Sequence, residues 1–322
     1  MIGMNWRRTA IFFLVLIVIA GFYYFRIRLP YPSDAPLSFS PEPRNAFILS
    51  LAPKESVEKI KIQSLANDNV EIVLHRLNEH DWQITKPVNY PAESLIINGF
   101  VTLLKLTPRV RPLSFNSVNE KEFGFDIPQI SICVSTNLRS KERCLLIGVP
   151  AAIVSGFYAK WKDEPQYFLL DRNAFDALDK GLYSLRQKQV FMLLDREVDT
   201  LHFKSAEKEI EMKQVEKIWR RTKPTKAALS EDKVNEVLVG LNGLYAKEFI
   251  DGKTWDQPEF GLRPPQQTIQ IVFKDGSQVT LLRGKEAVGK DAYYALGEDP
   301  KTVFLISTKK FKNVEVGFQK LV

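Results

Sequence analysis

The residue types that most often carry out catalysis are few in this chain of 322 residues. It has three histidines, His75, His80 and His202. Acid–base catalysis needs an imidazole held against a reacting group, and zinc motifs pair histidines with other ligands at set spacings. None of the three belongs to such a motif. We expect ordinary hydrogen-bonded or exposed histidines, and we keep the three as acid–base candidates of a rival hypothesis, an envelope hydrolase.

Signatures of a nucleophile or a nucleotide site are also missing. The sequence has no Gly-x-Ser-x-Gly turn, no Ser-x-x-Lys set with its companion motifs and no reactive-cysteine context. Its glycines, such as Gly240, Gly243 and Gly261, form no phosphate-binding loop. The sequence therefore predicts no catalytic, cofactor-binding or metal-ligating residue. We expect a protein that is not an enzyme and that holds no cofactor.

Two acidic pairs each have a structural explanation beside a chemical one. Glu120 and Glu122 lie in a connecting stretch, and Glu231 and Asp232 lie where a helix is expected to begin. Carboxylates in a first helical turn favour the helix dipole. A glycosidase would need two carboxylates at a defined separation across a cleft. Solvated or capping roles are the interpretation that we favour.

The two cysteines, Cys133 and Cys144, lie on either side of an expected turn. They face each other if that turn closes a hairpin, and an oxidising compartment would then join them. The alternative is a pair of ordinary strand thiols, and the sequence leaves both open. A metal site is not expected, because the spacing lacks a second ligand pair.

Aromatic residues are the remaining candidates for binding. Trp82 and Trp219 are either stacking platforms for sugars or peptides, or core residues that cover a helix packed on a sheet, and we favour the core. A second aromatic group either lines a groove between two domains or packs in the cores. It consists of Tyr158, Trp161, Tyr293 and Tyr294.

These residues recur at a near-constant interval, which indicates one folding unit used twice. The landmarks Trp82, Pro87, Phe123 and Gly124 recur 137 positions later as Trp219, Pro224, Phe260 and Gly261. At an interval of 136, Gly148, Phe157, Tyr158, Phe168 and Phe175 recur as Gly284, Tyr293, Tyr294, Phe304 and Phe311. The shared residues are of the types that pack cores and turn chains.

Each copy is predicted to be an antiparallel sheet with helices on one side, an α+β unit. Strands are expected where apolar residues alternate, as in Ile130, Ile132 and Val134. A helical stripe of Ile97, Phe100, Val101 and Leu104 is repeated by Val234, Val237, Leu238 and Leu241. Ser230 is the expected N-cap of the second helix, and Asp275-Gly276 is a two-residue turn signal. Short helices are expected around Phe175 and Phe311.

The N-terminus predicts a membrane anchor. Residues 10–25 form an unbroken apolar run between Arg7-Arg8 and Arg26, about 24 Å long as a helix against a hydrocarbon core of about 30 Å. A cleaved signal peptide is the alternative, but the aromatic cluster and arginines that follow suit an interface. We expect a transmembrane signal anchor at 1–28, a proline-rich spacer at 29–45, a first repeat at 46–195 and a second at 196–322.

Charge excludes one class of partner. The formal net charge is +7, but four arginines and no acids lie in the first 28 residues, which leaves 41 basic and 38 acidic residues in the remainder. The basic balance therefore belongs largely to the membrane flanks, and nucleic acid is not an expected partner.

The pattern of Trp, Pro, amphipathic helix, Phe-Gly-[FL]-x-x-Pro, Leu-x-Gly and Leu185-Arg186-Gln187-Lys188 resembles the DUF4340 family, a bacterial domain of unknown function. The resemblance covers most of residues 46–322. The second copy departs at Arg263, which precedes Pro264-Pro265. Such domains are often duplicated, often follow one membrane span, and occur beside components of gliding-motility-type ABC transporters. The resemblance implies an accessory role outside the cytoplasm and no catalytic residues.

These observations favour a single-pass protein of the bacterial inner membrane, with the bulk of the chain in the periplasm. We expect a scaffold or interaction protein that contacts membrane proteins, with ABC transporter subunits as candidate partners that would themselves hydrolyse the nucleotide. The alternative is a ligand-binding module with a cleft for glycan, lipid or peptide between the two repeats.

Overall fold

The computed structural model describes residues 47–113, 120–152, 155–194, 196–297 and 299–322. The predicted anchor at 1–28 and spacer at 29–45 lie outside these residues. Among the described residues, no helix is long and apolar enough to span a membrane.

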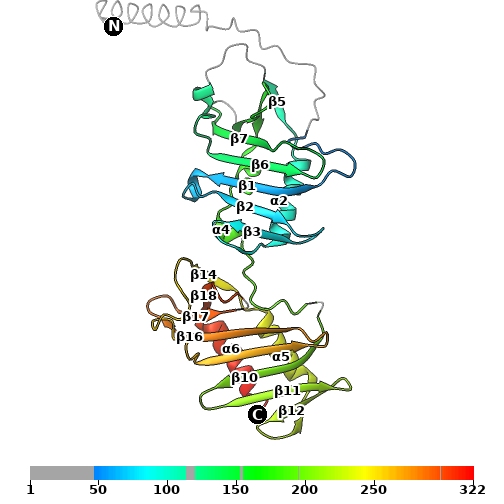
Figure 1. Cartoon of the computed structure of the whole chain (residues 1–322), viewed down its shortest axis with the longest axis vertical. Coiled ribbons are helices and arrows are strands. Elements are labelled where there is room, and N and C mark those ends of the chain that lie inside the picture. The colour runs from blue at the N-terminus through cyan, green and yellow to red at the C-terminus, as the bar shows by residue number, and fades with distance from the viewer. Residues whose placement is uncertain (1–46, 114–119, 153–154, 195, 298) are drawn as a thin grey trace, which may run out of the picture.

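The first repeat is a nine-stranded antiparallel sheet with helices on one face (Figure 1). Its strands are β1 (Val57–Ser64), β2 (Ile72–Arg76), β3 (Trp82–Lys86), β4 (Tyr90–Pro91), β5 (Val110–Leu113), β6 (Ile130–Thr136), β7 (Arg143–Pro150), β8 (Phe157–Trp161) and β9 (Tyr167–Leu170). Its helices are α2 (Ser94–Leu106), α3 (Arg172–Leu178) and α4 (Leu182–Leu185), with 3-10 turns η1 (Leu65–Asn67) and η2 (Glu120–Phe123).

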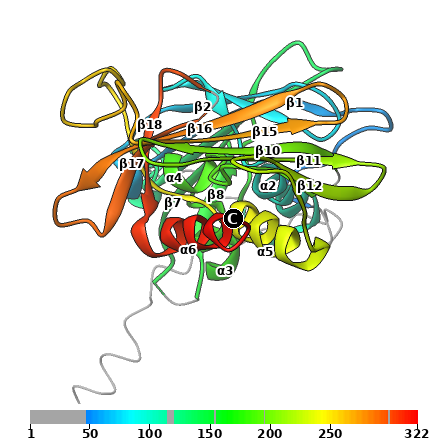
Figure 2. The same ribbon diagram turned by 90° about the horizontal axis from the view of Figure 1, so that it is seen from below.

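The second repeat has the same design. Its strands are β10 (Val198–Ser205), β11 (Glu209–Val215), β12 (Ile218–Lys223), β13 (Ala227–Ala228), β14 (Ala246–Ile250), β15 (Gln267–Phe273), β16 (Gln278–Ala287), β17 (Ala292–Leu296) and β18 (Val303–Ser307). Its helices are α5 (Glu231–Asn242) and α6 (Thr308–Gln319). Figure 2 shows α5, α6 and α3 on the same side of the sheets.

The strand orders prove the duplication. The first sheet runs β4-β3-β2-β1-β6-β7-β8-β9-β5, and the second runs β13-β12-β11-β10-β15-β16-β17-β18-β14. Adding nine to each strand number of the first sheet reproduces the second. The prediction of two similar α+β units in tandem is therefore confirmed.

Alternation of apolar residues explains why the strands form. Ile130, Ile132 and Val134 of β6 are all buried and separated by half-buried residues. In an extended strand such residues share one face, and that face packs against the helices. The helical stripe is confirmed likewise, since Ile97 of α2 and Val234 of α5 are both fully buried.

Shared turn residues have equivalent geometry in the two repeats. The Lys86–Pro87 and Lys223–Pro224 peptide bonds are both cis. The Arg263–Pro264 bond is also cis, at the place where the second copy departs from the first in sequence.

Two pairs of equivalent glycines show why the Phe-Gly and Leu-x-Gly motifs recur. Gly124 and Gly261 have φ values of 72° and 63°, the left-handed region that favours glycine. A Cβ on Gly148 or Gly284 would lie 1.8 or 1.9 Å from the carbonyl oxygen of the preceding motif's phenylalanine, Phe123 or Phe260. The turn therefore packs against a strand that must lack a side chain at that point.

Three local features differ from expectation. Ser230 precedes α5, but its side chain makes no capping hydrogen bond. The Asp275-Gly276 turn is longer than two residues, because Phe273 donates its backbone N–H to Ser277 and Gly276 takes the left-handed conformation. The helix around Phe311 has 12 residues, whereas the helix around Phe175 has seven.

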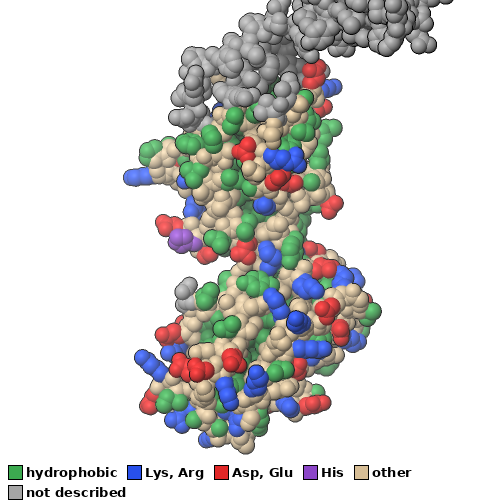
Figure 3. Space-filling view, turned by 180° about the vertical axis from the view of Figure 1, so that it is seen from behind, with side chains coloured by type: hydrophobic (Ala, Val, Ile, Leu, Met, Phe, Trp, Pro, Cys, Tyr) green, Lys and Arg blue, Asp and Glu red, His purple; other side chains and the backbone are tan. Residues whose placement is uncertain are grey.

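Each repeat has its own core, and the second includes Phe191, which is 1% exposed. Residues before 196, the predicted start of the second repeat, therefore already belong to the second core. On the face shown in Figure 3, lysine and arginine side chains of the second repeat are interspersed with aspartate and glutamate.

Candidate functional site

The three histidines lie at separate places in the fold. His75 lies in β2 and is half-buried, and His80 lies in the exposed turn before β3. His202 of β10 lies with its Nε2 3.0 Å from Glu209 Oε1. The hydrogen bond from Lys223, and then that from His202, lowers the pKa of the Glu209 carboxyl. This is a surface cluster of β10–β12, and none of the three histidines lines a cavity described below.

The two acidic pairs lie in different repeats, one in η2 and the other in α5. Glu120 of η2 accepts a hydrogen bond from the buried Lys160 ammonium at 2.6 Å. Glu231 and Asp232 occupy the first turn of α5, as predicted. Glu120 therefore neutralises a buried cation, and the α5 pair lies where the helix dipole stabilises it.

The cysteines form a disulfide. Cys133 of β6 and Cys144 of β7 are opposite each other in the ladder and are joined. Together with Glu142 they are the one group of three possible metal ligands among the described residues. Because both sulfurs are oxidised, the group presents no thiolate to a metal.

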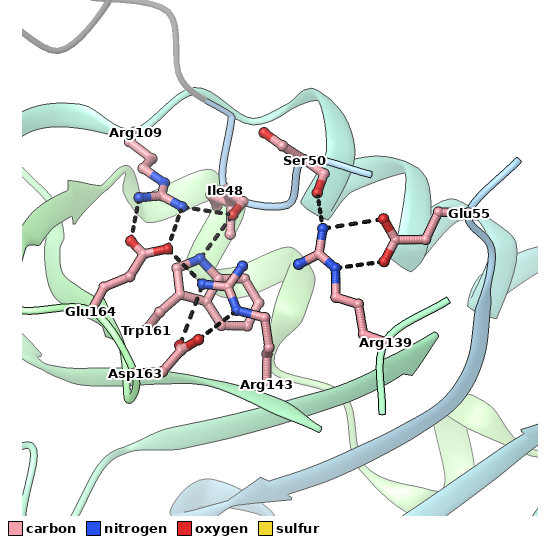
Figure 4. A network of polar contacts seen from close by, with 9 residues as sticks. All are labelled: Ile48, Ser50, Glu55, Arg109, Arg139, Arg143, Trp161, Asp163 and Glu164. Carbon is pink, nitrogen blue, oxygen red and sulfur yellow. Dashed lines mark hydrogen bonds and ion pairs between the residues drawn. The ribbon is translucent and has the colours of Figure 1, made fainter. Parts of the chain in front are cut away.

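A polar network in the first repeat fastens the segment before β1 to the sheet (Figure 4). Arg109 Nη1 lies 2.6 Å from Glu164 Oε2, and Arg143 Nη2 lies 2.5 Å from the other oxygen of that carboxylate. Arg143 also pairs with Asp163, and this hydrogen bond lowers the pKa of the Asp163 carboxyl. The indole of Trp161 donates to the Ile48 carbonyl at 2.9 Å.

The second half of the network surrounds Glu55, whose side chain is 1% exposed. Its carboxylate accepts hydrogen bonds from the Ala52 backbone N–H at 2.8 Å and from the Thr136 hydroxyl at 2.7 Å. It also forms an ion pair with Arg139 at 2.6 Å. The backbone hydrogen bond from Ala52 contributes most to lowering the pKa of Glu55. These carboxylates are already paired with arginine or hydrogen-bond donors, so we assign the network a structural role.

An open cavity lies in the second repeat, between α5 and one end of β10–β12. We call it the Trp219 hollow, and its volume is about 530 Å³. It is lined by Leu193, Leu194, Arg196, Glu197, Val198, Gln214, Lys217, Trp219, Glu231, Asn235, Leu238, Val239, Asn242 and Lys274. The volume is within the range of pockets that hold small ligands or inserted side chains.

The first repeat has a smaller hollow of about 210 Å³ at the equivalent place, beside Trp82 and α2. There the Trp82 indole donates to Asn98 Oδ1 at 2.9 Å, and Asn98 Nδ2 donates to the His80 carbonyl at 3.0 Å. Arg76 lies over the Trp82 ring at 5.9 Å. The indole of Trp82 and the amide of Asn98 are thus hydrogen-bonded within the repeat itself.

The Trp219 hollow lacks these internal contacts. Asn235 is the counterpart of Asn98, yet no hydrogen bond joins its side chain to the Trp219 indole among the described residues. Its rim carries two exposed apolar side chains, Leu194 at 74% and Val239 at 72% exposure, among exposed polar and charged ones. In the first repeat, the corresponding segment before β1 holds the small residue Ala52, and the position of α2 that corresponds to Val239 holds Thr102.

Both tryptophans are core residues, as favoured from the sequence, with 2% and 4% of Trp82 and Trp219 exposed. In the aromatic group, Trp161 and Tyr293 are buried in separate cores. The cavity at the joint between the repeats is about 140 Å³ and is lined by Tyr90, Lys188, Phe304 and their neighbours, not by that group.

Comparison with known proteins agrees with the duplication. The model of the domain of unknown function DUF4340 matches residues 82–218 and 219–315. The chain belongs to the DUF4340 family. No curated protein and no solved structure matches it. Each matched segment begins at a motif tryptophan, whereas each folded unit begins earlier, because β1 and β10 lie in the middle of their sheets and Ile48 and Phe191 before them lie in the cores.

The Leu-Arg-x-Lys motif of this DUF4340 chain forms the joint between repeats. Leu185 is buried in the first core, and Arg186 makes a two-pronged ion pair with Asp251 of the second repeat at 2.7 and 2.9 Å. The guanidinium also lies 4.4 Å from the centre of the Phe249 ring and 5.3 Å from that of Tyr90. These contacts, which come from both repeats, hold the two sheets together.

Sequence reasoning missed Leu194, Val239 and Asn235. A signal for two of them was present: Val239 is apolar where the first copy has Thr102, and the segment before β10 has the large apolar Leu194 where the segment before β1 has the small Ala52. Loss of the bond between Trp219 and Asn235 had no such signal, because the same residue types occur in both copies.

Proposed function

We propose that this DUF4340 protein is a membrane-tethered interaction protein outside the cytoplasm, whose joined repeats form a scaffold within an envelope complex. The observation that carries the proposal is the difference between two copies of one fold. One copy joins its tryptophan and asparagine by a hydrogen bond, and the other presents an open hollow with two large exposed apolar side chains at its rim. Large exposed apolar side chains grouped around a cavity are typical of a binding surface.

Two further features support the location. The apolar run at residues 10–25 with flanking arginines is typical of a signal anchor. A disulfide between Cys133 and Cys144 suits an oxidising compartment such as the periplasm. We infer a single-pass protein of the inner membrane with both repeats on the periplasmic side.

An ABC-type export system is the partner that we propose, and the support is the setting in which similar domains occur. Nothing resembling a nucleotide-binding loop is present in the sequence. In this proposal a separate subunit hydrolyses the nucleotide, and the present chain contributes contact surface.

Site-specific photo-crosslinking tests the proposal. A photoreactive residue at Leu194 of the full chain, in its native membrane, is expected to link to a membrane-protein partner. The same residue at Ala52, in the equivalent segment of the first repeat, is the matched control and should link far less. Equal yields at both positions, or recovery of the intact protein from the cytosol, would contradict the proposal.

The alternative function, a ligand-binding module with its site between the repeats, has weaker support. The cavity at the joint measures about 140 Å³, against about 530 Å³ for the Trp219 hollow. A crosslink that formed from the joint at Met192, and not from Leu194, would favour this alternative.

A further inference from the structure

We infer that the Trp219 hollow binds an extended polypeptide segment, which inserts one bulky apolar side chain and carries an acidic residue close to it. The inference rests on the proposed function and names the ligand of its binding surface. Three independent properties of the hollow support it: the two exposed apolar side chains at its rim, the free amide groups and the charge.

The rim provides a place for an apolar side chain. Leu194 and Val239 are exposed on opposite elements, the segment before β10 and helix α5, and Leu193 and Leu238 lie deeper in the lining. Trp219 contributes to the lining while only 4% of it is exposed. A side chain inserted among these groups loses its contact with water, and so do Leu194 and Val239, which favours binding.

The polar lining matches a peptide backbone. Gln214, Trp219 and Asn235 supply an amide, an indole N–H and a second amide, and none of the three side chains makes a hydrogen bond to another described residue. Each peptide unit offers one donor and one acceptor, which is what these groups require. An acyl chain offers neither and would leave them unsatisfied, so the lining favours peptide over lipid.

The charge of the lining favours an acidic residue in the bound peptide, close to its apolar side chain. Lys274 pairs with Glu197 at 2.8 Å and contributes most to lowering the pKa of that carboxyl, and the charge of Lys217 lowers it further, so two lysines share one carboxylate. Glu231 does not require a positively charged group on the ligand, because it lies in the first turn of α5, where the helix dipole favours a carboxylate. A ligand carboxylate near Lys217 would therefore complete the charge balance.

The experiment uses the full chain in lipid nanodiscs and a phage-displayed library of random peptides. Selected peptides are expected to share a Leu, Ile, Phe or Trp close to an Asp or Glu. Synthetic copies of the best sequence, one with the apolar residue replaced by Ala and one with the acid replaced by its amide, are then measured by fluorescence anisotropy. Both replacements are expected to weaken binding.

Variants of the protein locate the site. The double variant L194A/V239T gives the rim the residues of the first repeat and is expected to weaken binding about tenfold or more, as loss of an anchor contact does. The control A52L/T102V changes the first repeat in the opposite direction and should leave binding unchanged. Lys217→Gln should weaken binding roughly threefold and reduce its dependence on salt.

Three results would overturn the inference. The selected peptides could lack a shared apolar residue, they could bind L194A/V239T with unchanged affinity, or dodecanoate could occupy the hollow while no peptide binds. In any of these cases a persisting crosslink at Leu194 would keep the proposed function, with a partner that docks through another kind of surface. If no peptide binds and the crosslink at Leu194 is also absent, both the proposed function and the peptide ligand are refuted.

Discussion

At the scale of single residues, equivalent side chains in the two repeats have different partners. Trp82 and Trp219 lie at the same place in the fold, yet only the Trp82 indole donates to its neighbouring asparagine among the described residues. A buried hydrogen bond stabilises a fold by about 1 kcal/mol, and a group left unpaired costs more. The same substitution should therefore have different effects in the two copies.

We predict that Trp82→Phe destabilises the protein by about 1 kcal/mol more than Trp219→Phe, because only the first change removes an internal hydrogen bond. Both changes remove similar apolar volume, so each serves as control for the other. Urea unfolding of the full chain followed by circular dichroism measures the difference. Equal losses would show that the bond to Asn98 contributes nothing to stability.

The buried carboxylate of Glu55 predicts a dependence on pH. Its pKa is lowered from an ordinary value of 4.5, chiefly by the backbone N–H of Ala52. A group whose pKa is lower in the folded state stabilises the fold above its unfolded pKa and loses this contribution as the pH falls. The melting temperature should therefore fall below about pH 4.5, and it should do so less steeply in Glu55→Gln. If the melting temperatures of both proteins fell equally with pH, the result would contradict this role.

At the scale of elements, the turn that precedes β6 or β15 packs on β7 or β16 through a glycine. Gly148 and Gly284 allow the carbonyl oxygens of Phe123 and Phe260 to approach the strand. Close packing of backbone on backbone leaves no room for even a methyl group. This explains why the Leu-x-Gly motif occurs at the same point of both copies.

Gly148→Ala is expected to destabilise the first repeat by roughly 2–4 kcal/mol, because its Cβ would overlap a carbonyl oxygen. Gly99→Ala is the control. A Cβ added to Gly99, which lies in α2, would meet no other side chain or segment within 4 Å, and Ala there should stabilise the helix by about 0.5–1 kcal/mol. Thermal unfolding of both variants tests the contrast, and a neutral Gly148→Ala would refute the packing argument.

At the scale of the whole molecule, the joint between repeats decides whether the chain acts as one body. Arg186 has a side chain only 2% exposed, and its charge is balanced by Asp251 of the other repeat. Removing one member of a buried ion pair leaves the other charge uncompensated. The joint also includes a hydrogen bond from the Tyr183 hydroxyl to the Ala246 carbonyl.

We predict that Asp251→Asn loosens the joint at a cost of about 1–2 kcal/mol, because Arg186 is buried but Asp251 is 42% exposed and partly screened by solvent. Small-angle X-ray scattering of the full chain should show a larger radius of gyration, and unfolding should separate into two transitions. The exposed pair Lys253–Glu259 provides the control, since Glu259→Gln should leave stability nearly unchanged. An Asp251→Asn protein with unchanged scattering would show that the aromatic contacts suffice.

Much of the fold followed from local patterns. Alternating residues such as Ile130 and Ile132 indicate a strand whatever lies opposite, and the spacing of Ile97 and Phe100 indicates one face of a helix. The duplication needed only the constant interval between landmarks such as Trp82 and Trp219. Each of these signals is contained within a short stretch of chain or within a comparison of two stretches.

The sequence by itself thus determined the repeated α+β units and the scarcity of catalytic motifs, and it favoured a core role for the tryptophans. Only the tertiary structure decided that Cys133 and Cys144 are joined, that Arg186 meets Asp251, and that the second copy of a shared hollow is open. The physical reason is range. Backbone periodicity depends on neighbours a few positions away, whereas ion pairs, disulfides and cavities depend on where distant segments come to lie when the sheets close over their helices.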